Sequence, residues 1–488
     1  MVSLQAWITQ LQRKRNSMKR IFSYLLCVLS LSFISQGLAQ DVEADSTIKK
    51  LTLDDLYQMI MVYHPVAQQA ELLSAQGQMQ IRLGKGYFDP KLESKYDQKV
   101  FKNNEYYQKW NSYAKIPLWA GNINVGYERN DGYKLNPEND TDGGNGLMYI
   151  GLELPVLKGL LMDERRAALK KSHAMQKLAE ADQIKLINKL ILQIAKDYWE
   201  WYYTYHQYRL ALEGYELAQF RMESVDERIR QGDLATVDGV EAKITIQQRE
   251  INLRMAQMDL QKARLVLSNH MWTDEGKPLE LLPEILPEEL KVEILPSVDQ
   301  LIIEANIAHP DIIGLQAKNS ILAIDQRMAK EAVKPELNLK YNYLGTTPVS
   351  GWEYGLGENY KFGATFSMPL FLRKERAKLQ MSKLKIQDNE LSMIMKKREV
   401  SNNIRRAFIA VENYVELTDM QQEMSVNYQI LLQGEADKFE AGESTVFYMN
   451  VREGKLLEAE TKLFKMKAEY AKSVAELNWT AGVPPVMK

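Results

Sequence analysis

The stretch INKLILQIAKDYWEWYYTYHQYRLALEGYELAQFRMESVDERI, residues 187–229, determines the fold of this chain. Its apolar side chains recur in alternating steps of four and three residues, which keeps them on one seam of a helix that packs against a partner helix, as in a coiled coil. The pattern predicts an uninterrupted helix over 156–231, and about 70 residues of helix rise roughly 105 Å. The predicted seam consists of Ile187, Ile191, Ile194, Tyr198, Trp201, Tyr205, Tyr208, Leu212, Tyr215, Met222 and Ile229.

Two glycines interrupt the helical pattern and predict where the chain reverses. The rhythm continues after Gly232 over 234–272, and it returns on both sides of Gly442, over 370–441 and 444–482. Glycine accepts the left-handed backbone conformation that ends a helix. We therefore expect two antiparallel hairpins of long helices, with their tips at Gly232 and Gly442.

The two hairpins belong to two copies of one design. The spacing from His64-Pro65 to Pro90 equals the spacing from His309-Pro310 to Pro335, and similar residues surround both pairs. Self-similarity of this kind indicates a tandem duplication. The expected organisation is a first repeat, a crossover linker and a second repeat, over 40–278, 279–296 and 297–488.

Strand-like alternation of apolar and polar residues occurs only between the paired prolines of each repeat, over 91–154 and 336–369. Pro155 and Pro369 are expected to mark the change from strand to helix, since proline removes a ladder donor and suits the first turn of a helix. So little sheet cannot close a barrel alone, so several chains are expected to complete it. Aromatic residues expected to flank a lipid-facing side are Trp110, Trp119, Tyr127, Tyr149 and Tyr360.

Composition excludes several classes of protein. The chain has 488 residues and a formal net charge of −2, which lacks the basic footprint of a nucleic-acid binder. Residues 1–39 combine basic residues with a short apolar run, as in a signal peptide, whether the true start is Met1 or Met18. Removal of this segment would take away Cys27, the only cysteine, and leave an exported chain without disulfides.

Enzyme chemistry finds no support in the sequence. The five histidines are scattered, without the spacing of a metal site and without a cysteine to join them. The 22 methionines suit helical cores better than a soft-metal site. We therefore expect no catalytic residues, no metal and no cofactor.

The order and spacing of these helices, strands, prolines and glycines together resemble those of the TolC family of outer-membrane efflux proteins, also called outer membrane factors. The likeness covers essentially everything after residue 48. It rests on Leu51-Thr-Leu-Asp-Asp55, His64-Pro65, His309-Pro310, Leu154-Pro155-Val-Leu-Lys-Gly159, Gly232 with Thr236 to Glu241, and Gly442 to Gly482.

This resemblance implies a mainly α-helical chain with a β-barrel part. Three copies would form a twelve-stranded barrel in the outer membrane, from two strand hairpins per chain, and a tunnel of long α-hairpins extending into the periplasm. The implied function is a passive exit duct of a tripartite efflux or type I secretion system. Its partners would be a periplasmic adaptor, an inner-membrane RND or ABC pump that it reaches through this adaptor, and outer-membrane lipid. Nucleic acid would not be a partner. The alternative is a structural coiled-coil protein of the envelope without a transport role.

The resemblance also implies roles for the hairpin tips. Small and polar residues there are candidates for contact with the adaptor: Gly232, Asp233, Leu234, Thr236, Gly442, Glu443, Ser444 and Thr445. Family members often carry acidic residues on the helix after the second glycine, where three copies form a ring. Here that helix has Tyr448 and Val451 at these positions, which puts the usual acidic gate in doubt. The candidates for the constriction are Tyr448, Asp238, Glu241 and Glu453.

Overall fold

The computed structural model describes residues 50–292, 295–346 and 358–482. The predicted signal peptide with Cys27 lies outside the described residues. The chain divides into two compact units. Of the described residues, the first unit, which we call the helical unit, contains 50–71, 183–292, 295–310 and 397–482. The second, the sheet unit, consists of Leu72–Asp182 and Asp311–Lys396.

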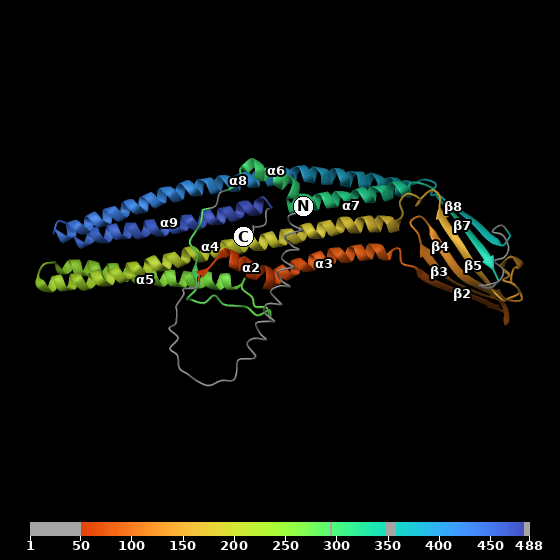
Figure 1. Ribbon diagram of the computed structural model, residues 1–488, viewed down its shortest axis with the longest axis horizontal. Coiled ribbons are helices and arrows are strands. Elements are labelled where there is room, and N and C mark those ends of the chain that lie inside the picture. Colours follow the sequence, from red (N-terminus) through yellow and green to blue (C-terminus); the bar gives the residue numbers. More distant parts are fainter. Residues whose placement is uncertain (1–49, 293–294, 347–357, 483–488) are drawn as a thin grey trace, which may run out of the picture. The chain divides into compact units, whose positions relative to one another are not determined.

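Each half of the chain contains two shorter helices, strands and then two long helices (Figure 1). The first half comprises β1 (Lys50–Leu51), α2 (Leu53–Tyr63), α3 (Pro65–Gly86), β2 (Lys91–Phe101), β3 (Asn104–Pro117), β4 (Asn122–Asp131), η1 (Pro137–Asn139), β5 (Leu147–Pro155), α4 (Glu164–Gln231) and α5 (Thr236–Ser268). The second half comprises β6 (Leu286–Pro287), α6 (Val298–Ala308), α7 (Pro310–Ala332), β7 (Glu336–Gly345), β8 (Tyr360–Ser367), α8 (Arg373–Glu440) and α9 (Val446–Thr480).

Proline starts two of these helices, but not the two that we expected. Pro65 and Pro310 are the first residues of α3 and α7, where proline's missing N–H costs nothing. Pro155 is instead the last residue of β5, and Pro369 lies between β8 and α8. Both prolines therefore stand where a strand ends before a long helix, and only the expectation that they occupy the first turn of that helix is wrong.

Backbone hydrogen bonds explain why α4 begins at Glu164 and not at 156. The amides of Val156 and Lys158 donate to the carbonyls of Leu337 and Pro335, at 2.8 and 3.1 Å, which holds the chain beside the neighbouring segment after β5 has ended. The helix starts only where the Asp163 carboxylate accepts from the amide of Arg166 at 3.0 Å, as a helix cap does. In the second half, Leu372 adopts a φ of +52°, so α8 begins at Arg373 and not at 370.

A single antiparallel sheet of six strands occupies the sheet unit, in the order β2-β3-β4-β5-β7-β8. The resemblance implied four strands per chain, which is wrong for this chain because the first half contributes two hairpins, β2–β3 and β4–β5. The second half contributes one hairpin, β7–β8.

The strand register separates two faces of the sheet, since successive side chains point to opposite sides. The apolar face carries Leu92, Tyr96, Trp110, Ala114, Ile116, Ile123, Val125, Tyr127, Met148, Ile150, Leu152, Leu339, Tyr341, Phe362, Ala364 and Phe366. The polar face carries Lys91, Glu93, Lys95, Asp97, Lys99, Lys109, Asn111, Tyr113, Lys115, Asn124, Gly126, Glu128, Tyr149, Gly151, Glu153, Glu336, Lys340, Asn342, Lys361 and Thr365. Tyr149 therefore does not belong to the lipid-facing aromatics with which we grouped it.

Tyr149 of β5 contacts β3 and β4 on the polar face and so links three strands. It is 3% exposed, and its hydroxyl donates to the Asn111 side chain of β3 at 2.9 Å. Its ring lies over Gly126 of β4, where an added Cβ would come within 2.6 Å of the ring. Only glycine fits beneath the ring at this point.

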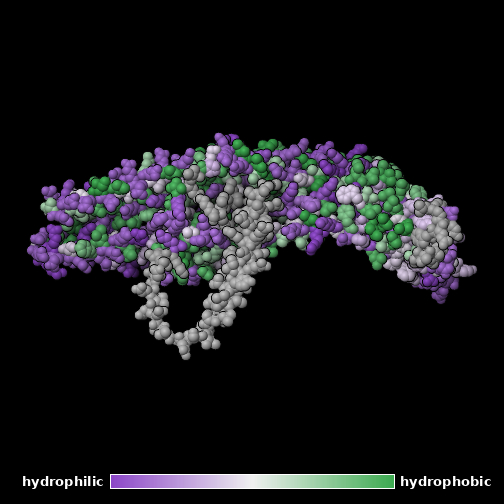
Figure 2. Space-filling view, in the orientation of Figure 1, coloured by the Kyte–Doolittle hydropathy of each residue, from purple (hydrophilic) through white to green (hydrophobic). Residues whose placement is uncertain are grey.

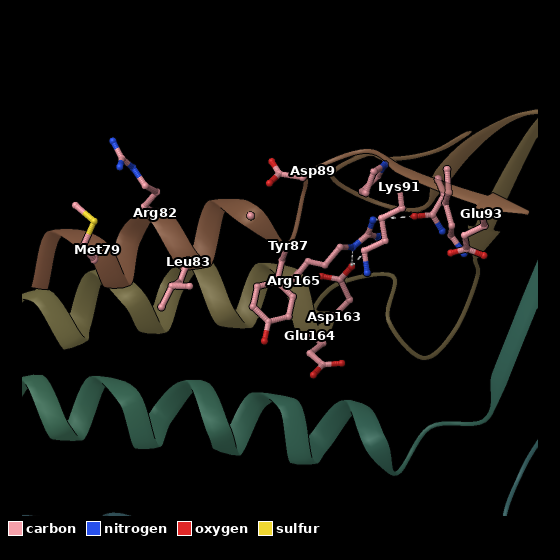
Figure 3. A pocket seen from close by; sticks show the side chains of 14 residues that line it. Met79, Arg82, Leu83, Tyr87, Asp89, Lys91, Glu93, Asp163, Glu164 and Arg165 are labelled. Atoms are coloured by element: carbon pink, nitrogen blue, oxygen red, sulfur yellow. Dashed lines mark hydrogen bonds and ion pairs between the residues drawn. The ribbon is translucent and has the colours of Figure 1, made fainter. Parts of the chain in front are cut away.

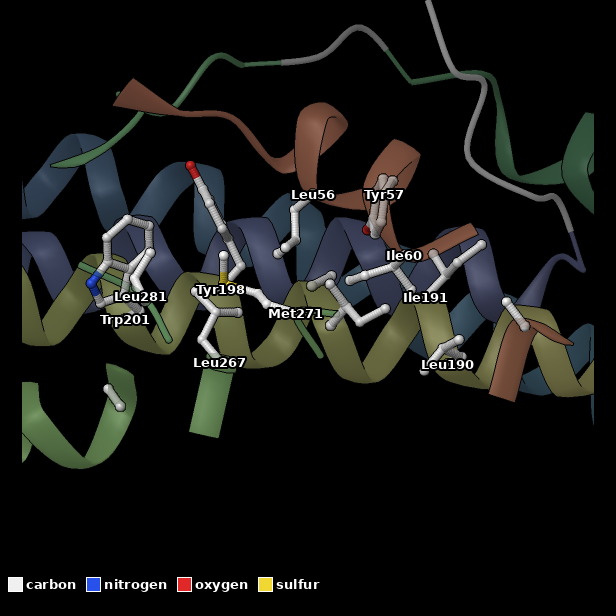
Figure 4. Packing of buried hydrophobic residues seen from close by; sticks show 14 of the residues in the cluster. Leu56, Tyr57, Ile60, Leu190, Ile191, Tyr198, Trp201, Leu267, Met271 and Leu281 are labelled. Atoms are coloured by element: carbon white, nitrogen blue, oxygen red, sulfur yellow. The ribbon is translucent and has the colours of Figure 1, made fainter. Parts of the chain in front are cut away.

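The helical unit has two apolar cores of similar design. In the first, Tyr198 and Trp201 of α4 pack with Leu56 and Ile60 of α2, and α5 and the segment after it close the cluster (Figure 4). In the second, α6 packs on α8 and α9 in the same way, around Leu301, Ala305, Val400, Ile404 and Leu477.

These cores bury only part of the predicted apolar seams. Ile194, Tyr198 and Trp201 are fully buried, but Val237 and Ile244 of α5 remain 68% and 61% exposed. Apolar stripes of this kind indicate a partner surface. No helix of the described part of the chain is long and apolar enough to cross a lipid bilayer.

The Tyr198 hydroxyl links β1 to the residue after β6, and its loss tests this link. It donates to the carbonyl of Leu51 at 2.8 Å and accepts from the amide of Glu288 at 3.0 Å. Tyr198→Phe leaves both groups without a partner, which costs about 1–3 kcal/mol. Hydrogen exchange around β1 and β6 should accelerate. Tyr208→Phe is the control, because that hydroxyl has no hydrogen-bond partner among the described residues; equal exchange in the two variants would contradict the link.

Candidate functional site: the tips of the helical hairpins

The two hairpin tips end α4 and α8 with the same turn. Gly232 has a φ of +86° and Gly442 a φ of +77°. The amide of each glycine donates to the carbonyl three residues earlier, at 3.1 and 3.2 Å, and the amide of the next residue donates five residues back, at 2.9 and 2.8 Å. This pair of bonds is the Schellman motif, which satisfies the last carbonyls of a helix.

Side chains fix the start of the second helix at each tip. Asp238 accepts from the amide of Ala235 at 3.2 Å, which caps α5. At the other tip the Ser444 hydroxyl donates to Glu435 of α8 at 2.6 Å, and Arg452 of α9 approaches the same carboxylate at 3.4 Å. The hydrogen bond from Ser444, and then the contact with Arg452, lower the pKa of Glu435. Glu435 therefore stays ionised and holds the second tip together.

The candidates for adaptor contact differ in exposure. Leu234 and Ser444 are half-buried, because Leu234 packs on neighbouring helices and Ser444 bonds to Glu435. The remaining candidates are exposed: Gly232, Asp233, Thr236, Gly442, Glu443 and Thr445.

A small apolar cluster joins the two tips within one chain. Val225 of α4, Ala242 of α5 and Val446 of α9 are all but fully buried, and Leu234 and Phe439 pack against them. The guanidinium of Arg228 lies 5.1 Å from the centre of the Phe439 ring, which adds a cation–π contact. The tips therefore form one packed end.

Glu453 lies in a buried ion cluster behind this end. Its carboxylate is 2.5 Å from Arg221 of α4 and 3.6 Å from Arg249 of α5, and its side chain is 3% exposed. Arg221 also donates to Asn450 at 2.7 Å, and Asn450 donates to Thr245 at 3.1 Å. Glu453 is therefore not the open carboxylate that we expected among the gate candidates. The two arginines were not foreseen, because the cluster draws on three helices and no local pattern brings them together.

The other gate candidates remain accessible. Tyr448 is 53% exposed and its ring meets the edge of Phe447, with the ring centres 5.5 Å apart. Asp238 and Glu241 are half-buried near the start of α5. The structure therefore separates Tyr448, Asp238 and Glu241 from the paired Glu453.

Two histidines that the sequence leaves scattered meet in the helical unit. His270 lies 2.7 Å from the Asp197 carboxylate, and its ring centre is 5.9 Å from that of His64. Burial, and then the nearby His270, lower the pKa of His64 to about 4, so His64 is neutral at pH 7. In the described part of the chain, no three His, Cys, Asp or Glu residues form a group that could hold a metal ion.

The sheet unit contains a hollow of about 1030 Å³ beside the end of α3 and the start of α4 (Figure 3). Arg165 crosses it to Asp163 at 3.1 Å and to Asn122 at 2.8 Å. Its basic side chains, Arg82, Lys91, Lys115 and Arg165, are matched in number by the acidic Asp89, Glu93, Asp163 and Glu164. This balance of charge favours no class of ligand.

Comparisons with known proteins give matches among solved structures. No family model and no curated protein matches the sequence. The outer membrane channel CmeC of Campylobacter jejuni matches with a TM-score of 0.62 and 15% identity, over 88% of this chain and 85% of that one. The open state of the Neisseria gonorrhoeae outer membrane channel MtrE matches with a TM-score of 0.63 and 16% identity, over 88% and 89%. The outer membrane protein VceC of Vibrio cholerae matches with a TM-score of 0.60 and 14% identity, over 88% and 96%. The chain therefore has the fold of these outer membrane proteins.

The glycine turns can be tested by adding a side chain. An added Cβ at Gly232 or Gly442 meets no atom within 4 Å, so a substitution acts through the backbone alone. Gly232→Val and Gly442→Val should each cost about 1–2 kcal/mol, because a β-branched residue resists the left-handed region. Limited proteolysis should cleave both variants faster at the altered tip.

Gly434→Ala in α8 is the matched control. Its added Cβ is equally unobstructed but lies on ordinary helical backbone, so the change should stabilise by about 0.5–1 kcal/mol. Valine variants as resistant to protease as the control would show that the turns do not depend on glycine.

Proposed function

We propose that this protein is an outer-membrane channel, the passive exit duct of a tripartite efflux or type I secretion system. The observation that carries the proposal is the division of the six-stranded sheet into an apolar and a polar face. A sheet that faces lipid on one side and water on the other has this alternation. In Figure 2, hydrophobic residues gather over the sheet.

The apolar face suits contact with lipid. Leu92 is 83% exposed, and Phe362 and Phe366 at the far edge are 57% and 64% exposed. The rings of Trp110 and Tyr127 meet edge to face, and those of Tyr341 and Tyr360 stack, as in an aromatic belt at a membrane surface. Among the strand residues described, the charged side chains on this side are Glu105 beside the bulge of the β2–β3 hairpin, and Arg129 and Asp131 at the end of β4.

Assembly into a homotrimer would supply the neighbours that the edge strands and the exposed helix stripes of one chain lack. Strands β2 and β8 are each paired on one side only among the described strands, and such edges need neighbours. Three copies of six strands would close a barrel of eighteen strands, wider than the twelve implied by the resemblance. The exposed apolar stripe of α5 would meet a long helix of another copy.

The helical unit would extend into the periplasm, and the tips would form the inner mouth. Their exposed residues, from Asp233 and Thr236 to Glu443 and Thr445, would contact a periplasmic adaptor, and through it an RND or ABC pump. The fold shared with CmeC and MtrE, which are described as outer membrane channels, supports this role. A structural coiled-coil protein would not need a sheet with a lipid-facing side.

Outer-membrane insertion can be tested with two lysines on one strand. Phe362 and Thr365 of β8 are both exposed in the single chain but lie on opposite faces. Phe362→Lys should cost about 2–4 kcal/mol in lipid and lower the amount of trimer in outer-membrane fractions. Thr365→Lys, on the polar face, should leave that amount unchanged. Equal yields of the two variants, or recovery of the wild type as a soluble monomer, would contradict the proposal.

Closure of the inner mouth is a separate question. We propose that the exposed Tyr448 narrows it, so Tyr448→Ala should raise the single-channel conductance in a planar bilayer. Asp238→Ala and Glu241→Ala test the other two accessible candidates. Unchanged conductance in Tyr448→Ala, with an increase in either acidic variant, would place the constriction on the first repeat.

A further inference from the structure

The polar face of the sheet carries more positive than negative charge. By the register it presents seven lysines and five acidic residues from the six strands. The lysines are Lys91, Lys95, Lys99, Lys109, Lys115, Lys340 and Lys361, and the acidic residues are Glu93, Asp97, Glu128, Glu153 and Glu336.

Each of the five carboxylates on this face already has a partner. Four of them pair with lysines: Asp97 with Lys95 at 2.8 Å, Glu128 with Lys361 at 3.5 Å, Glu153 with Lys115 at 3.3 Å, and Glu336 with Lys158 at 3.1 Å. The fifth, Glu93, accepts a hydrogen bond from the Tyr113 hydroxyl. The negative charge of this face is therefore largely compensated within the chain.

Four lysines of the face make no ion pair with a described residue: Lys91, Lys99, Lys109 and Lys340. Lys99 and Lys109 lie over the rings of Tyr106 and Tyr107, at 5.2 and 4.9 Å from the ring centres. A cation–π contact holds an ammonium in place without neutralising it. Their positive charge therefore remains available to a solute.

We propose that the polar face makes the barrel end of the channel selective for anions, and that anionic solutes are its favoured class of cargo. The inference rests on the proposed function, because the face lines a pore only if the sheet closes into a barrel. Three copies would then place six excess positive charges around one water-filled lumen. Rings of fixed charge of one sign raise the local concentration of the opposite ion.

The test is the reversal potential of the purified protein in a planar bilayer under a KCl gradient. The wild type should favour chloride over potassium. Lys99→Glu/Lys109→Glu should lower the chloride-to-potassium permeability ratio by at least about twofold, since two unpaired charges per chain change sign. Lys277→Glu/Lys291→Glu is the matched control, with the same change in net charge at exposed lysines outside the sheet. The control should keep the wild-type ratio.

A cysteine variant keeps the test independent of folding. Lys99→Cys is assembled first and then modified in the bilayer, with Cys27, the only native cysteine, in the predicted signal peptide. A negatively charged methanethiosulfonate should lower the chloride preference of the modified channel, and a positively charged one should restore it. Equal effects of the two reagents would overturn the inference.

The outcomes separate the two proposals. Protein that forms trimers but never conducts would overturn the channel function, and the inference with it. A conducting wild type that favours potassium, or one whose ratio is the same in Lys99→Glu/Lys109→Glu and in the control pair, would overturn the anion selectivity alone.

Discussion

The long helices carry more apolar surface than one chain can bury, and much of the structure follows from how that surface is shared. Over 187–201 the seam of α4 is covered by α2, by α5 and by the segment that follows α5. Farther along, α5 leaves Val237 and Ile244 open to solvent. A coiled-coil seam is stable when it meets a second one, so the same feature that builds the hairpins within the chain leaves an apolar surface that suits another chain. The sheet has a comparable requirement at its two edges.

The elements that could be predicted from the sequence are those fixed by local rules. The period of the seam around Tyr198 and the need for glycine at 232 and 442 depend only on nearby residues, and both are found in the structure. The start of α4 could not be predicted, because Val156 and Lys158 bond to residues 335–337, far along the chain. Pro155 resembles a helix start in the sequence because the long-range hydrogen bonds of Val156 and Lys158 cannot be seen there.

The residues of the candidate site also divide into those that could be predicted from the sequence and those that could not. Exposure at Gly232 and Gly442 follows from their place in tight turns, and the sequence predicts it well. The pairing of Glu453 with Arg221 and Arg249 depends on three helices meeting, which no spacing along the chain reveals. The extra hairpin β2–β3 was visible as alternating residues, but the resemblance to a known family led us to expect fewer strands.

Tyr149 has a consequence for how copies come together. Its ring occupies the space above Gly126 and its hydroxyl donates to Asn111, so side chains of one chain hold β3, β4 and β5 together on this face. Ordering strands during association would draw on the free energy of binding, whereas strands that are already linked within one chain do not. In the proposed trimer, each copy would bring a set of strands that its own side chains already hold together.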